Sequence, residues 1–481
     1  MPKFVLLWTD MVVLALVLAL AWYVWHLRRK PNLRANWKRV FQNTPALCSS
    51  VIIALGLLTT VLDSVHFRPR LVDAGSVAKA AAYDTRTLSV FDVLLSRLSQ
   101  MRESSYSRPL DYESFTKESV ARNGQVLRIN PRLTHAGALL KDPAHDWLPD
   151  LFRRAAIGLA LGALAALLLS AALIAVVARS QQRSFGATAA RIWHRETDIP
   201  WRAALITISL VALLAGPVAV LMQQYHVLGT DRTGNDVLLQ SLKSIRTAFV
   251  IGTLSTLATL PLAVVLGIMA GYFKVWIDEI IQYLYTTLSS VPNVLLIAAC
   301  VLMVQVYMDK HPELFETGAE RSDLRLFLLC VILGLTGWAG LCRLLRAETL
   351  KLRELDYVQA ANAFGVSAWR IMARHIFPNV VHLMLITTVL DFCGLILYEA
   401  VLSYVGVGVD PSMNSFGGMI NLARTEMSRD PLVWWSFASA FTFMVTLVLA
   451  ANLFADGVQE AFDPRARVFR PRVASKKKVV A

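Results

Sequence analysis

Histidine pairs and short catalytic motifs are the first candidates for chemistry in this sequence. His375 and His382 lie seven residues apart and could share one face of a helix, where a metal ion could bind them. No third ligand stands near them, so two hydrogen-bonded histidines at a membrane interface are the better interpretation. The chain also contains no HExxH and no GxSxG motif. The sequence therefore disfavours an intramembrane enzyme, and we expect no catalytic residue and no metal site.

The sequence also gives little sign of nucleotide binding or redox chemistry. The dipeptide Gly-Lys does not occur, so the chain has no GxxxxGK(S/T) loop that could cradle the phosphates of ATP. Its five cysteines lie within or beside apolar stretches and form no CxxC pair, which is typical of small buried hydrophobic residues. We therefore expect this chain to bind no cofactor of its own.

Four polar residues interrupt apolar segments. A charge in the middle of a membrane span costs about 2.5–3.5 kcal/mol on translocon scales, so Asp391 should face a pore, a partner or the bundle interior. Asn293 follows a proline and could satisfy the backbone groups that the proline frees. Asp391 and Asn293 mark a candidate translocation pathway, with a structural hydrogen bond or a protonated acid as the alternative for Asp391. Glu399 suggests a structural or gating role, and Asp10 is expected to snorkel toward water.

The amino-acid composition indicates the class of fold that holds these side chains. Of the 481 residues, 56% are hydrophobic and only 17% are charged, and the mean hydropathy is +0.50. An average soluble domain has about 25% charged residues, so soluble, disordered and fibrous proteins are disfavoured. The net charge of +14 comes from basic residues beside apolar runs, which argues against a nucleic-acid partner. The expected fold is an all-α polytopic membrane protein, in contact with lipid.

Nine segments are long and apolar enough to cross a bilayer, which takes about 20 residues per helix. The proposed inner loops hold 25 lysines and arginines and the short outer loops hold 9, which predicts an outside N-terminus and a cytoplasmic C-terminus. The long polar stretch 66–154 is expected outside, as a small α+β module. The predicted spans are 4–27, 46–65, 155–178, 203–222, 247–273, 280–308, 326–346, 380–402 and 432–455.

The segment 356–379 is amphipathic and lies between two predicted spans. Asp356 is expected to cap a helix, in which Ala360, Ala361 and Phe364 recur at helical spacing before Gly365 interrupts the pattern. A surface helix lying on the membrane is the simpler interpretation. The pair of small residues followed by glycine instead favours close approach by another protein.

The segment 228–237, with the sequence LGTDRTGNDV, has the residue types of a turn. Glycine tolerates positive φ angles, and aspartate and asparagine side chains bond to nearby backbone. The residues that define this pattern are Gly229, Thr230, Asp231, Gly234 and Asp236.

These segments resemble the permease subunits of bacterial ABC importers. Gln359-Ala360-Ala361, Gly365 and Phe377-Pro378 are similar to the family's EAA loop, with Gln for Glu and Phe for Leu. LGTDRTGNDV is similar to the GTDxxGRDV signature of the C-type permeases of dipeptide, oligopeptide and nickel importers, with Asn235 for the usual Arg. The stretch 399–408 and the tail 456–465 resemble two further family blocks. Their matching residues are Glu399, Gly406, Gly408, Asp456, Gly457, Asp463 and Pro464.

The resemblance covers 228–467, and 33–62 resembles the family's opening. It implies a type I core of six spans, to which this chain adds three spans and the polar insertion. The implied divisions are an extra N-terminal span (1–27), an amphipathic helix with the first core span (28–65), the insertion (66–154), an extra two-span hairpin (155–222), the permease core (223–467) and a basic cytoplasmic tail (468–481).

The resemblance also implies a function. The chain would be the non-enzymatic translocation subunit of an ATP-driven importer for peptides or related small solutes, in the bacterial cytoplasmic (inner) membrane. Its partners would be a second, homologous permease, two cytoplasmic ATPases that carry ATP and Mg, and an external solute-binding protein. The residues implied in coupling to the ATPases are Asp356, Gln359, Ala360, Ala361, Phe364 and Gly365. The alternative is a membrane scaffold or sensor whose 66–154 module binds a partner.

Overall fold

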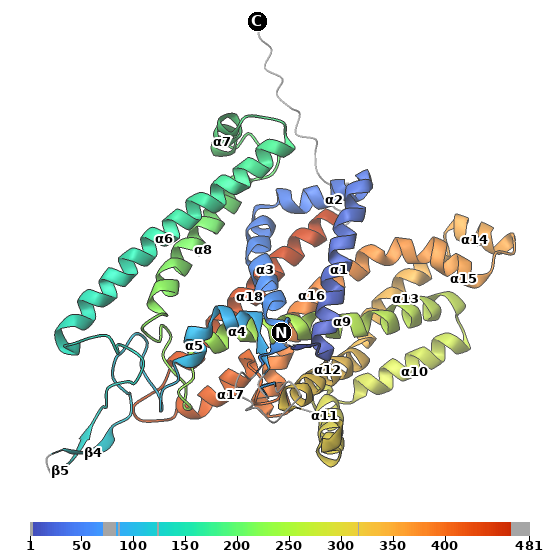
Figure 1. Ribbon diagram of the computed structural model, residues 1–481. Helices are drawn as coiled ribbons and strands as arrows, with labels where there is room; N and C mark the ends of the chain where they lie inside the picture. Colours follow the sequence, from blue (N-terminus) through green and yellow to red (C-terminus); the bar gives the residue numbers. More distant parts are fainter. Residues whose placement is uncertain (1–2, 71–82, 85–86, 123–124, 316, 463–481) are drawn as a thin grey trace, which may run out of the picture.

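Long helices dominate the computed structural model, which describes residues 3–70, 83–84, 87–122, 125–315 and 317–462 (Figure 1). Among these residues, nine helical segments are long and apolar enough to cross a membrane, which agrees with the predicted number of spans and confirms the all-α polytopic class. The membrane candidates are α1 (Trp8–Arg29), α3 (Thr44–Asp63), α6 (Pro143–Ser180), α8 (Trp201–Leu221), α9 (Val237–Phe273), α11 (Asn293–Lys310), α12 (Gly318–Gly337) continuing into α13 (Ala339–Arg353), α16 (Phe377–Val405) with the turns before it, and α18 (Trp435–Phe462).

Shorter helices connect these segments. They are α2 (Pro31–Gln42), α4 (Val90–Leu94), α5 (Ser96–Gln100), α7 (Phe185–Trp193), α10 (Trp276–Ser290), the 3₁₀ turn η1 (Pro312–Leu314), α14 (Asp356–Ala363), α15 (Ala368–Ile371), the π-helical turn η2 (Met372–Ile376) and α17 (Phe416–Glu426).

The predicted single span 280–308 is wrong. The chain forms α10, breaks at Val291 and Pro292, and starts again as α11 at Asn293. Proline has no backbone N–H and pushes the residue before it out of the helical region, and Val291 accordingly is extended with ψ 134°. Asn293 is therefore the first residue of α11, and its side chain is exposed.

Strands occur at one end of the molecule, as the α+β expectation for 66–154 requires. β2 (His66–Arg68) pairs antiparallel with β3 (Leu88–Ser89), and β4 (Glu118–Arg122) forms a hairpin with β5 (Gln125–Ile129). β1 (Lys3–Val5), from the N-terminus, also pairs with β2. We call this end the module end. Helices α2 and α7 lie at the top of Figure 1 and α14 at its right, all away from β4 and β5, and we call this side the distal end.

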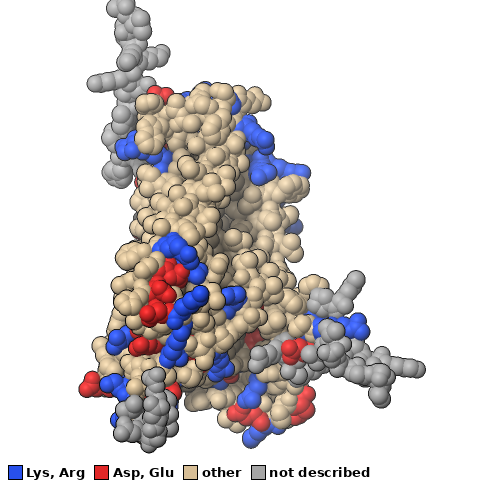
Figure 2. All heavy atoms as spheres, turned by 60° about the vertical axis from the view of Figure 1, so that its left-hand side comes forward, with Lys and Arg blue, Asp and Glu red and all other residues tan. Residues whose placement is uncertain are grey.

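Helices α6 and α8 form a tightly packed hairpin. A Cβ atom at Gly158 would overlap Pro217, and one at Gly162 would lie 2.6 Å from the carbonyl oxygen of Ala212. Small residues let membrane helices approach this closely. The hairpin stands beside the remaining helices at the left of Figure 1, and the space-filling view of that side shows a hollow between two ridges (Figure 2).

Helix α1 is held by a buried charge cluster, which corrects the expectation that Asp10 snorkels to water. Asp10 is fully buried, and its two oxygens lie 2.6 Å from Arg246 Nη2 and 2.7 Å from His66 Nδ1. Arg246 also lies 3.7 Å from Asp323, which accepts a hydrogen bond from the backbone of Thr9. Because a lone buried charge is costly, this arrangement ties α1 to α9 and α12.

Candidate functional site

Helix α14 and the turn after it present most of the predicted coupling residues at the surface. Phe364 is 87% exposed, and Asp356, Gln359, Ala360 and Gly365 are exposed as well. Ala361 is half-buried and packs against the core beneath. The sequence thus brings all six residues together on one short element, at the distal end.

Asp356 does not cap this helix, contrary to expectation. Leu355 occupies the N-cap position, and no side chain bonds there, because the extended backbone that precedes the helix ends one residue earlier than predicted. Asp356 is the first helical residue, where its negative charge still favours the helix dipole.

Gly365 ends α14 in a left-handed conformation. Its φ is +73°, and the N–H of Val366 donates to the carbonyl of Ala361 at 3.1 Å, which is a Schellman cap. A Cβ atom at Gly365 would meet nothing within 4 Å. The position needs glycine for its backbone angle, and the space beside it is open to a partner.

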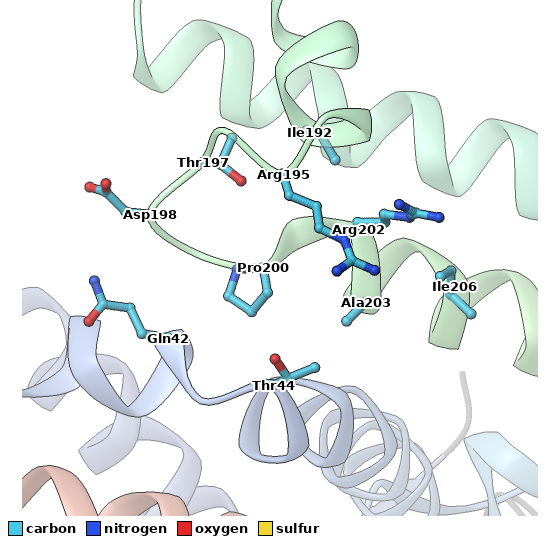
Figure 3. A pocket seen from close by; sticks show the side chains of 10 residues that line it. All are labelled: Gln42, Thr44, Ile192, Arg195, Thr197, Asp198, Pro200, Arg202, Ala203 and Ile206. Atoms are coloured by element: carbon cyan, nitrogen blue, oxygen red, sulfur yellow. The ribbon is translucent and has the colours of Figure 1, made fainter. Parts of the chain in front are cut away.

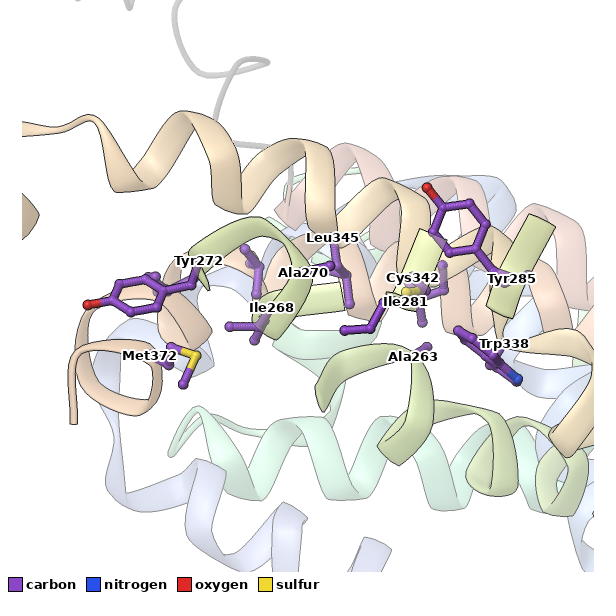
Figure 4. Close-up of a cluster of buried hydrophobic side chains, with 14 of the residues drawn as sticks. Ala263, Ile268, Ala270, Tyr272, Ile281, Tyr285, Trp338, Cys342, Leu345 and Met372 are labelled. Atoms are coloured by element: carbon purple, nitrogen blue, oxygen red, sulfur yellow. The ribbon is translucent and has the colours of Figure 1, made fainter. Parts of the chain in front are cut away.

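The other face of α14 is anchored to the helical core. Val358 is fully buried in a hydrophobic cluster with residues of α9, α10 and α13, drawn in Figure 4. Tyr272, the penultimate residue of α9, donates a hydrogen bond to Asn362 at 2.8 Å, and its carbonyl accepts one from Arg353 at 2.7 Å. These contacts tie α14 to the adjoining ends of α9 and α13.

The signature turn, residues 229–236, is buried against the insertion at the module end. Thr230 is fully buried, accepts a hydrogen bond from the backbone N–H of Ser107 at 2.6 Å, and donates one to the carbonyl of Ser105 at 2.8 Å. Its own carbonyl accepts a bond from Trp435 Nε1 at 2.9 Å. The turn therefore holds together the insertion, α9 and α18.

Positive φ angles confirm the predicted turn chemistry. Gly229 and Gly234 have φ of +74° and +75°, and a Cβ atom at Gly234 would overlap the carbonyl oxygen of Glu103. Asp231 accepts bonds from the backbone of Thr233 at 2.8 Å and of Asn235 at 2.9 Å. These contacts make the turn self-supporting, and the insertion leaves no room beside Gly234.

Asp236 starts α9 and binds a buried histidine that sequence reasoning missed. It caps the helix by accepting bonds from the N–H groups of Leu238 and Leu239, and its other oxygen lies 2.7 Å from His226 Nδ1. Glu103 lies 3.7 Å from the opposite nitrogen of that ring. Asp236 is thus a structural residue, joined to the insertion through His226.

The two acidic partners keep His226 charged. Burial disfavours the imidazolium form, but Asp236 and Glu103 raise the pKa of His226 to about 9. Burial also opposes ionisation of Glu103, yet the nearby charge of His226 and hydrogen bonds from Thr134 and the backbone N–H of Ala136 lower the pKa of Glu103 below the usual range. The three groups form a closed ion cluster between the insertion and the turn.

The block 399–408 forms a second compact element. Glu399 is buried in α16 and accepts a hydrogen bond from Ser403 at 2.6 Å. Gly406 ends α16 with φ +87°, and a Cβ atom at Gly408 would overlap Ser403. Gly417 of α17 also packs against Glu399, so this block fixes the loop between α16 and α17.

The remaining predicted residues are spread along the chain. Gly457 lets α18 approach α3, since a Cβ atom there would overlap Ala46, whereas Asp456 is exposed. Asp391 is exposed in the middle of α16. Asp463 and Pro464 lie outside the described residues, as does the tail 468–481.

Metal ligands are not grouped in the part of the chain that the structure describes. No set of three or more His, Cys, Asp or Glu side chains there could hold a metal ion. His375 lies in η2 against the ring of Tyr357, and His382 lies further along in α16.

Arg246, His226 and Glu103 carry much of the buried polar structure without having been predicted. Arg246 and Asp10 could have been found, because opposite charges at the ends of two apolar segments favour pairing in a membrane. Glu103 gives no such signal, because Thr134 and His226 lie 31 and 123 residues further along the chain. Only the fold brings them near Glu103.

Comparison with known proteins agrees with this architecture. The model of a family described as "Binding-protein-dependent transport system inner membrane component" matches residues 263–468. The chain is 30% identical over 245 residues to the oligopeptide transport system permease protein OppC of Mycobacterium tuberculosis, covering 51% of this chain and 78% of that protein. It is 31% identical over 242 residues to the glutathione transport system permease protein GsiD of Pectobacterium atrosepticum, covering 50% of this chain and 73% of that protein.

The helical bundle and these similarities define a multi-pass membrane transport protein. The chain belongs to the family of inner membrane components of binding-protein-dependent transport systems, as a permease component of an ABC importer. Such a component works within a transporter complex that has other subunits.

Proposed function

We propose that this chain is the permease subunit of an ATP-driven importer for peptides or related small solutes, and that it couples ATPase motion to alternating access. The relatives whose names specify oligopeptide, dipeptide and glutathione transport support the solute class. ATP and Mg would be held by two separate ATPase subunits. A second permease and an external solute-binding protein would complete the complex.

The exposed α14 surface carries this proposal. Groups of exposed apolar side chains mark interaction sites, and Phe364, Tyr357 and Trp369 are all exposed on this short segment. Aromatic side chains beside a flat, small-residue patch suit insertion into a cleft of a folded protein. We assign this surface to docking of an ATPase subunit.

The contacts that anchor α14 to the core would couple motion of the ATPase subunits to the membrane helices. The hydrogen bonds among Tyr272, Asn362 and Arg353 and the burial of Val358 make α14 and the adjoining ends of α9 and α13 move as one body. Closure of the ATPase dimer would then shift these helices between an inward-open and an outward-open packing.

The exposed acid of α16 suits a solute pathway that is completed only when a second permease is present. Asp391 is exposed in mid-helix, where contact with lipid is unfavourable for a carboxylate. We assign it to the surface that faces the second permease or the solute pathway, and place Asn293 in the same role at the start of α11.

Replacing Phe364 tests the docking surface. Phe364→Ala should weaken copurification of the ATPase subunits and uptake, because an interface anchor contributes about 1–3 kcal/mol, or roughly 5- to 150-fold in association. Phe185→Ala is the matched control, since Phe185 is an exposed phenylalanine of another short helix, α7, at the same end. Unchanged ATPase copurification and uptake with Phe364→Ala would refute the assignment.

Thiol labelling tests the orientation. We propose that the module end lies outside the cytoplasmic membrane and the distal end inside. Ser104 is exposed at the module end, so Ser104→Cys should react with a membrane-impermeant thiol reagent in cells whose outer barrier alone is permeabilised. The unsubstituted protein, with Cys48 and Cys300 half-buried, gives the background. Labelling that requires lysis of the inner membrane would reverse the orientation.

A further inference from the structure

A cleft at the distal end separates the added hairpin from the helices that precede the insertion. It has a volume of about 420 Å³ and lies between the α2–α3 turn and the α7–α8 loop (Figure 3). The lining comprises Gln42, Thr44, Ile192, Arg195, Thr197, Asp198, Pro200, Arg202, Ala203 and Ile206.

The upper part of the cleft is positively charged. Asp198 is neutralised by Lys38 at 2.6 Å, which leaves Arg195 and Arg202 as the lining charges. Within the described part of the chain Arg195 makes no ion pair, and Figure 3 shows its side chain reaching into the space above Thr44. Arg202 stacks on the ring of Trp193 at 5.0 Å, which leaves the edge of its guanidinium group available to donate.

Below the arginines the walls become apolar. Ile206 lines the cleft from α8, and Leu210 and Leu213 follow it on the same helical face, all exposed. Across the gap, Leu55 and Leu58 of α3 lie at helical spacing below Thr44 and are also exposed. These residues continue the cleft as an apolar strip along α3 and α8, which we call the trough.

The trough is closed at both ends. The pair of Lys38 and Asp198 joins the walls at the top, and Leu62 packs in one hydrophobic cluster with Val218 and Phe91 near the bottom. The leucines between these contacts are exposed. A ligand that fills this space must be charged at one end and apolar along its length.

We propose that this cleft binds an anionic phospholipid, with its phosphate group on Arg195 and Arg202 and its acyl chains in the trough between α3 and α8. Basic pockets between membrane helices bind anionic lipid headgroups, and guanidinium groups suit phosphate geometry. A free phosphate would use the arginines and leave the trough empty, so the lipid is the better match. The bound lipid joins the added hairpin to the core along the membrane.

Thermal unfolding of the purified full-length protein in detergent tests this site. Added phosphatidylglycerol should raise the unfolding temperature, whereas phosphatidylcholine and inorganic phosphate at equal concentration should not. The double variant Arg195→Gln/Arg202→Gln should need about 30-fold more phosphatidylglycerol, from about 1 kcal/mol per basic residue near a membrane surface. Arg195→Gln alone should need about 5-fold more phosphatidylglycerol. Because Arg195 is exposed, this single variant should fold normally and provides a test if the double variant misfolds.

The matched control is Arg179→Gln/Arg183→Gln. Both arginines are exposed at the same end but do not line the cleft, so the change in net charge is identical. It should leave the response to phosphatidylglycerol unchanged. The proposal fails if the wild-type protein does not respond, if the cleft variants respond like wild type, or if inorganic phosphate stabilises as well as the lipid.

Discussion

The signature turn (229–236) and the α14 loop (356–365) both carry family motifs, and the structure uses them in opposite ways. Thr230, Gly234 and Asp236 are buried, and the first two bond directly to the insertion. Gln359, Phe364 and Gly365 are instead exposed. A motif in a membrane protein can therefore encode either packing within the chain or a surface offered to another one. Only the second kind should change complex formation without changing stability.

Two glycines provide the largest expected contrast. Gly234 and Gly365 have nearly the same φ, +75° and +73°, but a Cβ atom at Gly234 overlaps Glu103 and one at Gly365 meets nothing. Either change to alanine should cost about 1–2 kcal/mol for the left-handed backbone. Gly234→Ala should cost about 1–3 kcal/mol more for overpacking. Unfolding temperatures in detergent measure the difference, and equal losses would mean that the turn is not packed as described.

The ion cluster behind the turn gives the next largest effect. His226 has a raised pKa, so its contribution to stability is complete below pH 6.5 and is lost as the pH rises through about 9. Glu103 has a lowered pKa, so its contribution is present above pH 4.5 and is lost at lower pH. Stability should therefore be highest between these limits and fall by roughly 3 kcal/mol toward pH 10.

His226→Gln isolates that effect, because a glutamine cannot be charged. The variant should be less stable at pH 6 and should lose the fall in unfolding temperature between pH 7 and 10. A variant that keeps the wild-type pH profile would show that another group is responsible. The α14 loop should contribute nothing to this pH dependence of the unfolding temperature, so Phe364→Ala serves as the control.

Asn235→Arg, which restores the residue usual in the family, should have the smallest effect. Asn235 is half-buried, and its side chain donates to Thr233 within the turn itself, at 2.7 Å. Surface changes of this kind usually stay within about 0.5 kcal/mol. A much larger shift in unfolding temperature would mean that position 235 contacts the insertion more closely than the rest of the turn indicates.

The number of spans and the placement of the α14 loop could be predicted because each depends on local pattern. Apolar length predicts a span, and the Ala-Ala pair with Gly365 marks a helix end whatever surrounds it. The break at Val291 was harder, because a proline inside an apolar run is compatible with a kink as well as with two helices.

The buried contacts could not be predicted because they join distant segments. Nothing in the sequence around Glu103 indicates that it lies beside Gly234 and His226, and Asp10 resembles a residue that could reach water. Which charges pair inside a fold is decided by the arrangement of the helices, and that arrangement depends on the whole chain.

The buried position of Asp10 has a consequence for the order of assembly. Its partner Arg246 lies 236 residues later in the chain. At synthesis rates of about 5–20 residues per second, Arg246 is made roughly 10 to 50 s after Asp10. Throughout that interval Asp10 has His66 within reach but lacks its arginine, so α1 cannot be fixed against α9. Helix α1 is therefore fixed in place only after α9 and α12, which follow it in the chain, have entered the membrane.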